Sequence, residues 1–458
     1  MYVQDTIVAP ATAAGRGAVA IVRLSGPRAI AILDAIWRPP GAALRPRELK
    51  LGDVIDSATG AQIDRAMATI MIAPKSLTGE DVAEIQCHGG AYIVRRIVAL
   101  AIEHGARMAE PGEFSRRAFL NGRIDLAEAE AVADLVEARS ETALAQALAQ
   151  LSGALSERVG RLRNEVIAIR AHLEAEIDFA DENIELPARD EIARAIERLG
   201  AEVATIGDTF ARGRIVREGI RAAIVGKPNA GKSSLLNLML GAERAIVTAV
   251  PGTTRDVIED FIALGPYSIT LADTAGMREA GDEVERLGIE RTARAARDAE
   301  LLIAAFDASR PFQDDDARVI EIARGRAGIA LLNKRDLPPR LTAHELRGRG
   351  LTIPILGVSA LVLEDAAAIR AELERAASAI TAAPASDEIA ISRERHRVAL
   401  EKAAAALAEA CAGALKGVPP EMIAVDVMAA ADALGQITGE VTSEDVLDAV
   451  FREFCIGK

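Results

Sequence analysis

The segment from Gly226 to Ser233 has the residue types and the spacing needed to hold a nucleotide phosphate. It reads Gly-Lys-Pro-Asn-Ala-Gly-Lys-Ser and matches the pattern G-x-x-x-x-G-K-S. Glycines let successive backbone N–H groups turn toward an anion, and the N-terminus of a following helix adds partial positive charge. In this chemistry Lys232 reaches the β- and γ-phosphates, and the Ser233 hydroxyl holds Mg²⁺. The segment therefore predicts a phosphate-binding loop.

Three later segments favour GTP over other nucleotides. Asp273-Thr274-Ala275-Gly276 offers an aspartate that faces Mg²⁺ and a glycine beside the γ-phosphate. The aspartate of Asn333-Lys334-Arg335-Asp336 can accept two hydrogen bonds from guanine N1 and N2, which adenine cannot supply. Ser359-Ala360-Leu361 offers a backbone N–H to guanine O6. The four segments in this order predict a guanine-nucleotide site.

Apolar runs in the sequence predict the strands that must position these segments. Such runs precede the four segments at Ile220–Val225, Ile269–Ala272, Ile329–Leu332 and Ile353–Val358, and a helical run, Ser234–Leu240, follows the first. This strand–loop–helix context is the one a phosphate loop requires. We expect a Ras-like P-loop GTPase domain over residues 215–380.

The position after Asp273-Thr274-Ala275-Gly276 is Met277, whose thioether cannot orient water as the glutamine of Ras-type enzymes does. Another polar residue must therefore act if the domain hydrolyses GTP. Oxygen ligands for a monovalent cation could come from Asn229, Thr248, the Val250 carbonyl and Thr253. Spacing alone leaves the source of the transition-state positive charge open between such a cation and an arginine supplied in trans.

Composition limits the class of protein. The chain has 458 residues with 54 Lys and Arg against 68 Asp and Glu, a formal charge of −14, which excludes a uniformly basic nucleic-acid binder. Three scattered cysteines form no C-x-x-C pair, which suits a reducing compartment. No apolar run is long enough for a membrane span. We expect a cytoplasmic protein without a membrane partner.

The flanks of the GTPase segment differ from each other. Residues 1–118 alternate short β-rich pieces with turns and a helix at Ala91–His104, which predicts a small α+β domain. Residues 119–214 are rich in amphipathic helix, with Gly153 and Gly160 as possible breaks. Helical composition resumes over 381–458. We expect one α-helical domain split by the inserted GTPase domain.

These residues carry a resemblance that covers essentially the whole chain: the sequence resembles the MnmE (TrmE) family of bacterial tRNA-modifying GTPases. The matching segments are Asp5-Thr6-Ile7-Val8-Ala9, Gly15-Arg16-Gly17-Ala18-Val19, Arg23-Leu24-Ser25-Gly26, Thr78-Gly79-Glu80-Asp81, His88-Gly89-Gly90, Pro111-Gly112-Glu113-Phe114, Arg117-Ala118-Phe119-Leu120-Asn121-Gly122, Thr253-Thr254-Arg255-Asp256, Gly288-Ile289-Glu290-Arg291 and Phe454-Cys455-Ile456-Gly457-Lys458.

The resemblance implies a fold, a set of cofactors and several partners. The N-terminal domain is expected to be related to folate-dependent one-carbon enzymes, to form a homodimer and to bind 5-formyl- or 5,10-methylene-tetrahydrofolate. GTP, Mg²⁺ and K⁺ are the expected ligands of the GTPase domains, which meet across the dimer and so activate hydrolysis. The flavoprotein MnmG (GidA), in a heterotetramer-type complex, would contribute FAD and NADH. The expected nucleic-acid partner is tRNA, not DNA.

The resemblance also implies roles for individual residues. GTP contacts are expected at Asn229, Ala230, Gly231, Lys232, Ser233, Ser234, Thr248, Ala249, Val250, Pro251, Gly252, Thr253, Thr254, Asp273, Thr274, Ala275, Gly276, Asn333, Lys334, Asp336, Ser359, Ala360 and Leu361. Ser233 and Thr254 are expected to bind magnesium, and Asn229, Thr248, Val250 and Thr253 to bind potassium. Glu285 is the expected water-orienting glutamate. Arg23, Glu80, Lys458 and Arg123 are expected to bind folate. The family often has lysine at the position of Arg123, and arginine changes the geometry of the hydrogen-bond donors.

Cys455 is a further catalytic candidate with two interpretations. A cysteine beside a folate pocket can act as a nucleophile toward a base or a one-carbon unit. A free cysteine can equally be a buried small hydrophobe, which is also the interpretation favoured for Cys87.

The resemblance implies addition of an aminomethyl or carboxymethylaminomethyl group to C5 of the wobble uridine, position 34, of certain tRNAs. Two other functions stay open. A regulatory GTPase of the ribosome-assembly type would carry an RNA-binding fold such as a KH domain with its G-x-x-G loop. A structural GTPase of the dynamin type would carry a membrane-binding tip. The sequence after residue 390 offers helix and the Cys-Ile-Gly-Lys ending.

Overall fold

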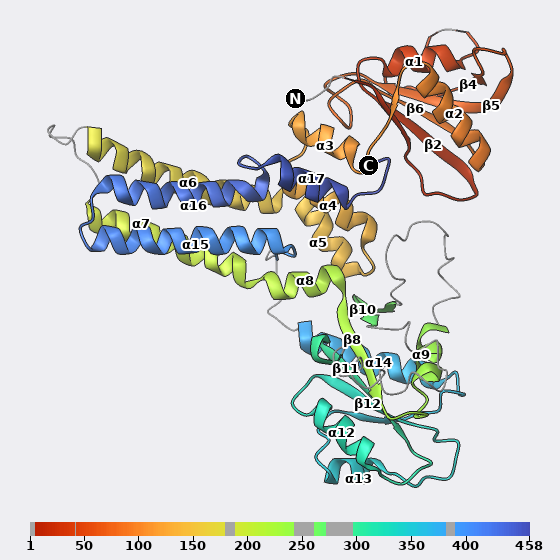
Figure 1. Cartoon of the computed structure of the whole chain (residues 1–458), viewed down its shortest axis with the longest axis vertical. Helices are drawn as coiled ribbons and strands as arrows, with labels where there is room; N and C mark the ends of the chain where they lie inside the picture. Colours follow the sequence, from red (N-terminus) through yellow and green to blue (C-terminus); the bar gives the residue numbers. More distant parts are fainter. Residues whose placement is uncertain (1–4, 42, 179–187, 242–260, 272–295, 382–389) are drawn as a thin grey trace.

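The structure is a computed structural model that describes residues 5–41, 43–178, 188–241, 261–271, 296–381 and 390–458. Its described elements form an N-terminal sheet, a long helical part and a second sheet (Figure 1). Among the described residues, no helix is both long and apolar enough to cross a membrane.

The N-terminal part is built on a seven-stranded sheet with the order β3-β4-β5-β6-β2-β1-β7. Its elements are β1 (Ile7–Pro10), β2 (Gly17–Ser25), α1 (Ala29–Ile36), β3 (Trp37–Arg38), β4 (Lys50–Ile55), β5 (Gln62–Met71), β6 (Val82–Gly89), α2 (Ala91–Glu103) and β7 (Arg107–Met108). Alternate residues of the central strands, such as Val22 and Leu24, are buried against the two helices. Arg23 and Ser25 therefore lie on the other face of β2.

The helical part joins segments from both ends of the sequence. Its elements are α3 (Glu113–Leu120), α4 (Leu126–Glu137), α5 (Glu141–Leu151), α6 (Ala154–Asp178), α7 (Arg189–Asp208), α8 (Phe210–Glu218), α15 (Glu394–Leu415), α16 (Pro420–Thr438) and α17 (Glu444–Arg452). Buried residues of α6 recur at steps of three and four, from Leu155 to Leu173, and this apolar stripe packs into a common core with α7, α15 and α16. Helices far apart in the sequence thus lie side by side (Figure 1).

The second sheet has six strands in the order β13-β12-β11-β8-β10-β9, parallel except for β9. Its elements are β8 (Ile220–Gly226), α9 (Lys232–Gly241), β9 (Phe261–Leu264), β10 (Tyr267–Leu271), β11 (Leu301–Asp307), α12 (Asp314–Ala323), β12 (Gly328–Asn333), α13 (Ala343–Gly348), β13 (Ile355–Gly357) and α14 (Asp365–Thr381). β11 is buried along its whole length, with a separate apolar core on each face of the sheet. The carboxyl ends of the parallel strands meet at one edge, where ligands of such sheets bind.

Most predicted elements are confirmed at their centres. Gly153 separates α5 from α6, as expected, but the break predicted at Gly160 is wrong, because Gly160 lies within α6. A break that the sequence did not suggest falls at 138–140, where Ser140 caps the start of α5. Helix α1 and strand β4 were not anticipated.

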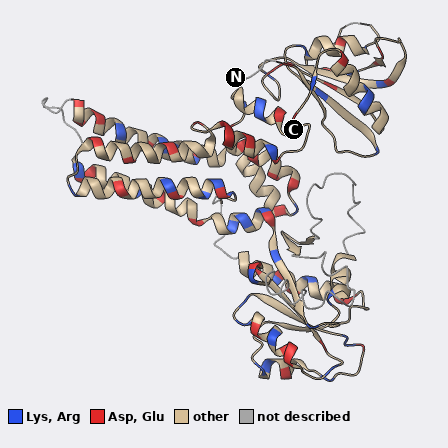
Figure 2. Ribbon diagram, viewed as in Figure 1, with Lys and Arg blue, Asp and Glu red and all other residues tan. Residues whose placement is uncertain are grey.

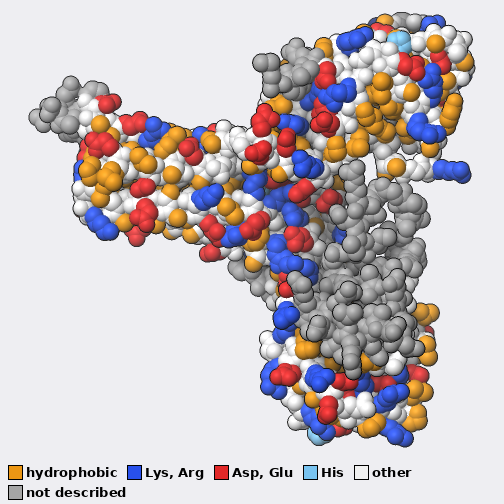
Figure 3. All heavy atoms as spheres, in the orientation of Figure 1, with side chains coloured by type: hydrophobic (Ala, Val, Ile, Leu, Met, Phe, Trp, Pro, Cys, Tyr) orange, Lys and Arg blue, Asp and Glu red, His pale blue; other side chains and the backbone are white. Residues whose placement is uncertain are grey.

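Charged side chains of both signs are spread along the helical part (Figure 2). On the face shown in Figure 3, acidic and basic side chains alternate over the helices. Three arginines of the helical part are paired with acids: Arg161 with Glu202, Arg214 with Glu300 and Arg397 with Glu394. Ion pairing at partly exposed positions therefore explains these three arginines.

Candidate functional site

The predicted phosphate loop lies between β8 and α9, at the carboxyl edge of the second sheet. The Lys232 ammonium folds back over the loop and donates to the carbonyls of Gly226 (2.8 Å) and Lys227 (3.0 Å). Gly231 has φ of +89°, and a Cβ there would lie 2.2 Å from Asn333 Nδ2. The loop thus needs glycine at this position for its close approach to the next motif. The residues present fit a bound phosphate chain.

The Asn333-Lys334 segment braces the phosphate loop from β12. Buried Asn333 donates from Nδ2 to the Ala230 carbonyl (2.9 Å) and accepts at Oδ1 from the Ala360 N–H (3.0 Å). Lys334 donates to the Asn229 carbonyl (2.9 Å) and to Asp307 Oδ2 (2.7 Å). Burial alone would raise the pKa of Asp307, but hydrogen bonds from Lys334 and Ser309 outweigh it and lower the pKa. Three loops are therefore tied together at one edge.

The predicted base-recognition residues lie beside this brace. Ser359 donates from Oγ to Asp336 Oδ1 (2.6 Å), and its own N–H is held by Asp365 (2.6 Å). Asp336 is exposed, so its second oxygen faces outward from this contact. Leu361 donates its N–H to Ser359 Oγ (3.3 Å) and leaves its side chain in solvent. A carboxylate fixed by a hydroxyl, next to an apolar surface, can read a planar base with paired N–H donors.

Three further predicted residues, one in the phosphate loop and two at the start of helix α9, are exposed. Asn229 has φ of +61° and is exposed, which places a polar side chain at the outside of the turn. Ser233 and Ser234 open helix α9 and are exposed, where a helix N-terminus favours an anion. The remaining predicted nucleotide, metal and catalytic residues lie outside the described residues: Thr248, Ala249, Val250, Pro251, Gly252, Thr253, Thr254, Asp273, Thr274, Ala275, Gly276 and Glu285.

A second polar site lies on the N-terminal sheet, where the C-terminal residues contact strand β2. Arg23 of β2 donates to Glu84 (2.8 Å) and to the Gly457 carbonyl (3.4 Å). The Lys458 carbonyl accepts from the Phe114 N–H (3.1 Å). Burial lowers the pKa of Lys458, and the charge of Arg23 lowers it further. Two of the predicted folate residues, Arg23 and Lys458, are thus brought close together.

The other two predicted folate residues lie next to each other in the same part of the molecule. Glu80 accepts from Ser25 Oγ (2.7 Å), and Ser25 shares a face of β2 with Arg23. Arg123 is exposed beside Gly79, since a Cβ at Gly79 would lie 3.3 Å from Arg123 Cγ. An arginine, a lysine and a carboxylate on one surface suit a ligand with carboxylates and N–H donors.

Cys455 is exposed, so its interpretation as a buried hydrophobe is wrong. It is fixed through its backbone, whose carbonyl accepts from the N–H groups of Lys458 (3.3 Å) and Gly112 (3.4 Å). Cys87 is buried, as predicted, and burial raises the pKa of its thiol to about 11.

Sequence reasoning missed several residues that hold the two sites together. Asp307, Ser25, Thr78 and Arg117 each contact a predicted site residue, and none had been assigned a role. Ser25, Thr78 and Arg117 lie within the segments that carry the resemblance, and Arg117 also lies four residues after Glu113, at the pairing distance of a helix.

Comparisons with known proteins place the chain in one family. Family models described as "GTP-binding protein TrmE N-terminus" and "MnmE helical domain" match residues 6–123 and 126–455. The tRNA modification GTPase MnmE of Symbiobacterium thermophilum is 43% identical over 99% of this chain and 100% of its own. The protein of that name from Moorella thermoacetica is 43% identical over 99% of each chain. Among solved structures, the G domain of the T. maritima FeoB iron transporter is 23% identical, covering 36% of this chain and 99% of its own with a TM-score of 0.24, too low to support an argument.

Proposed function

The chain belongs to the MnmE family of tRNA modification GTPases, and we propose on that premise that it hydrolyses GTP in the modification of the wobble uridine of tRNA. The observation that carries the GTP assignment is the brace among three loops: Asn333 to Ala230, Lys334 to Asn229 and Ser359 to Asp336. These contacts hold a phosphate loop and a base-reading carboxylate at one strand edge.

In this proposal the chain's own residues divide the binding work. Lys232 exchanges its two carbonyl partners for phosphate oxygens, and Ser233 provides a hydroxyl for Mg²⁺. Asp336 accepts from guanine N1 and N2, while Ser359 keeps its other oxygen in place. Asp336→Asn is expected to weaken GTP binding about 100-fold, the scale of two hydrogen bonds to a charged group.

Hydrolysis is proposed to depend on one residue of the phosphate loop and on several residues that follow it in the sequence. Asn229 is exposed at a positive-φ turn and could contribute an oxygen ligand to potassium, together with Thr248, Val250 and Thr253. A cation there would supply the positive charge that phosphoryl transfer requires. Glu285 is proposed to orient the attacking water, with Met277 unable to do so, and Thr254 to assist Ser233 with Mg²⁺. Contact between the GTPase domains of a homodimer would complete the site.

We also propose that the second sheet, residues 215–380, is a GTPase domain inserted between residues 119–214 and 381–458 of one helical domain. Contacts of α7 with α15 and of α6 with α16 support this division. The N-terminal domain, residues 1–118, would bind a tetrahydrofolate through Arg23, Glu80, Arg123 and Lys458. Folate would supply the one-carbon unit for an aminomethyl or carboxymethylaminomethyl group, with the flavoprotein MnmG contributing FAD and NADH.

Two experiments test the proposal at different depths. The GTP hydrolysis rate should rise steeply when potassium replaces sodium, because a supplied positive charge is worth about 10³–10⁵ in arginine-finger systems. Glu285→Ala should bind GTP and lose turnover. An equal rate in both salts would remove the potassium assignment, and retained turnover would remove that of Glu285.

A third experiment addresses the product of the modification reaction. Deletion of the gene should remove the modification at C5 of uridine 34 from bulk tRNA, measured by mass spectrometry of nucleosides. Complementation with the unaltered gene should restore it, and complementation with the Asp336→Asn variant should restore less. Normal modification in the deletion strain would overturn the function in tRNA modification.

A further inference from the structure

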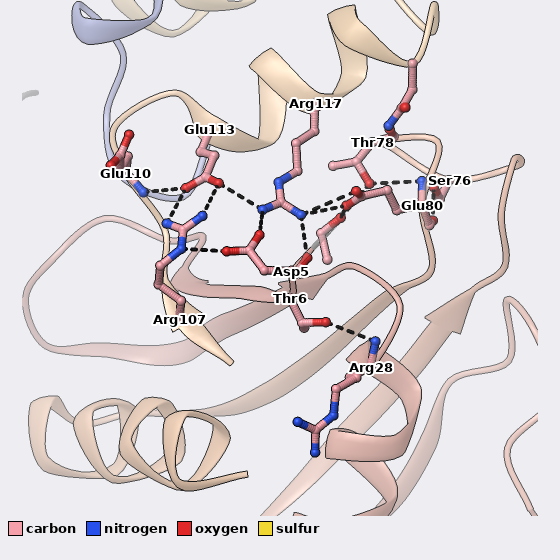
Figure 4. Close-up of polar contacts among 12 residues, drawn as sticks. Asp5, Thr6, Arg28, Ser76, Thr78, Glu80, Arg107, Glu110, Glu113 and Arg117 are labelled. Carbon is pink, nitrogen blue, oxygen red and sulfur yellow. Dashed lines mark hydrogen bonds and ion pairs between the residues drawn. The ribbon is translucent and has the colours of Figure 1, made fainter. Parts of the chain in front are cut away.

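Arg117 is a buried arginine at which three carboxylates converge (Figure 4). Its side chain is 2% exposed. One guanidinium nitrogen donates to Asp5 Oδ1 (2.5 Å) and Glu113 Oε1 (2.9 Å), and the other to Glu80 Oε2 (3.1 Å) and the Asp5 carbonyl (2.9 Å). A buried arginine of this kind fixes the geometry of every carboxylate it contacts.

Contacts at the start of helix α3 hold Arg117 in position. The helix starts after Gly112, whose φ of +68° and close approach to the Phe451 carbonyl leave no room for a side chain. Glu113, one turn before Arg117, is held by Arg107 (2.7 Å) and by the Glu110 N–H (2.8 Å). The position of the guanidinium is therefore set by groups other than Glu80.

Glu80 differs from the other two acids in what surrounds it. Its Oε2 accepts from both Arg117 and Ser25, and Ser25 is itself bonded to Thr78 (2.6 Å). Asp5 and Glu113 are also bonded to Arg107, whereas Glu80 is also bonded to Ser25. Both Glu80 oxygens accept from Arg117, Oε1 at 3.3 Å and Oε2 at 3.1 Å, and the Glu80 side chain is 14% exposed.

We propose that Arg117 is a positioning residue for ligand recognition by Glu80. It holds the carboxylate in one orientation, in which the carboxylate accepts the paired N–H donors of a pteridine ring. The inference rests on the proposed tetrahydrofolate site and adds to it a residue that does not itself touch the ligand. A clamp that only joins the first strand to α3 would need Arg117 and Arg107 alike.

Arg107 supplies a matched control, since it belongs to the same ionic network through its contacts with Asp5 and Glu113. Binding of 5-formyltetrahydrofolate to the full chain should be measured by titration calorimetry for the unaltered protein, Glu80→Gln, Arg117→Lys and Arg107→Lys. Lysine keeps the charge but cannot span several carboxylates. Arg117→Lys is expected to weaken binding about tenfold, the scale of one hydrogen bond to a charged group, and Arg107→Lys to leave it unchanged.

The double variant Glu80→Gln with Arg117→Lys separates positioning from general loss of structure. If Arg117 acts through Glu80, the double variant should bind no more weakly than Glu80→Gln alone. Fluorescence of Trp37, the single tryptophan and buried in the N-terminal sheet, reports whether each variant is folded. Should Arg117→Lys fail to fold, Arg117→Gln in the same cycle takes its place.

The outcomes distinguish the inference from its premise. Weak binding by Glu80→Gln with normal binding by Arg117→Lys would overturn the inference alone, as would multiplying effects in the double variant. Equal losses in Arg117→Lys and Arg107→Lys would assign both arginines to structure and also overturn it. Absence of binding by the unaltered protein would overturn the tetrahydrofolate site together with the inference.

Discussion

Two buried ionic clusters in this molecule have opposite designs. The Arg117 cluster consists of Asp5, Glu80, Arg107, Glu113 and Arg117, with a cation at its centre. Its formal charge is −1, from three acids and two arginines. The acids remain 12–29% exposed. A cluster of this kind keeps surplus negative charge near solvent, where a ligand can meet it.

The Glu130 cluster consists of Glu130, Asp134, Arg393, Arg395 and His396, with an anion at its centre. Glu130 is 2% exposed and accepts from Arg395 (2.9 Å) and His396 (2.8 Å). Arg395 also donates to the Ile437 carbonyl at the end of α16 (3.1 Å). Two acids balance two arginines, and the cluster joins α4 to α15 and α16. Closure and balance suit a brace, whereas openness and surplus charge suit a binding site.

The largest effect is expected from Glu130→Ala. Removing the central anion leaves Arg395, which is 21% exposed, and fully buried His396 without their shared partner, and breaking a buried pair in this way costs about 3–5 kcal/mol. Urea unfolding of the full chain, followed by far-ultraviolet circular dichroism, should show this loss in the helical signal. Glu453→Ala is the control: Glu453 is 67% exposed and pairs with Arg393 at the rim, where a pair is worth about 0–1 kcal/mol. Equal losses in the two variants would contradict the distinction between centre and rim.

Arg117→Met should cost less, about 2–3 kcal/mol, although it also removes a buried centre. Its three carboxylates are partly exposed, and water can solvate them once the guanidinium is gone. Trp37 fluorescence isolates unfolding of the N-terminal sheet from that of the helices. A loss as large as that of Glu130→Ala would show that exposure of the acids gives no relief and would break the comparison between the clusters.

The two proposed binding sites also differ in how far the sequence predicts them. The nucleotide edge could be predicted because each motif is local: Asn333, Lys334 and Asp336 directly follow one buried strand, and parallel strands bring such loops together. Sequence could not show that Lys334 reaches the Asn229 carbonyl or that Ser359 holds Asp336. Those contacts depend on how the loops that follow adjacent strands are placed relative to one another.

The N-terminal site could not be predicted from residue patterns. Ser25 and Thr78 are 53 residues apart in the sequence, and Arg23 and Gly457 are 434 apart. Only the strand order β6-β2-β1 and the return of the chain after α17 bring them together. The resemblance named Arg23, Glu80, Arg123 and Lys458, but the support that Arg117 gives to Glu80 became visible only with coordinates. The break expected at Gly160 failed because the apolar stripe of α6 continues through it.

The smallest predicted effect is a dependence of stability on pH that belongs to the Glu130 cluster alone. Burial lowers the pKa of His396 below its ordinary value of 6.5. The unfolded chain then binds a proton that the folded chain does not, so stability falls as the pH falls through 6.5, by at most about 1.4 kcal/mol per pH unit. In the Arg117 cluster, burial alone would raise the pKa values of Asp5 and Glu113, but hydrogen bonds from Arg107 and Arg117 outweigh it and lower them. Their contribution is therefore lost only below the ordinary values of 3.8 and 4.5.

Unfolding between pH 7.5 and 5.5 should accordingly separate the two clusters. The helical signal should lose stability over this range in the unaltered protein and less so in His396→Gln, whose amide can still donate to Glu130. His172→Gln, an exposed position on α6, serves as the control and should follow the unaltered protein. The Trp37 signal should change little, because the lowered pKa values of Asp5 and Glu113 keep these two acids ionised over this range. If His396→Gln kept the full pH dependence, protonation of His396 would not be its source, and the Glu130 cluster would be no more sensitive to pH than its open counterpart.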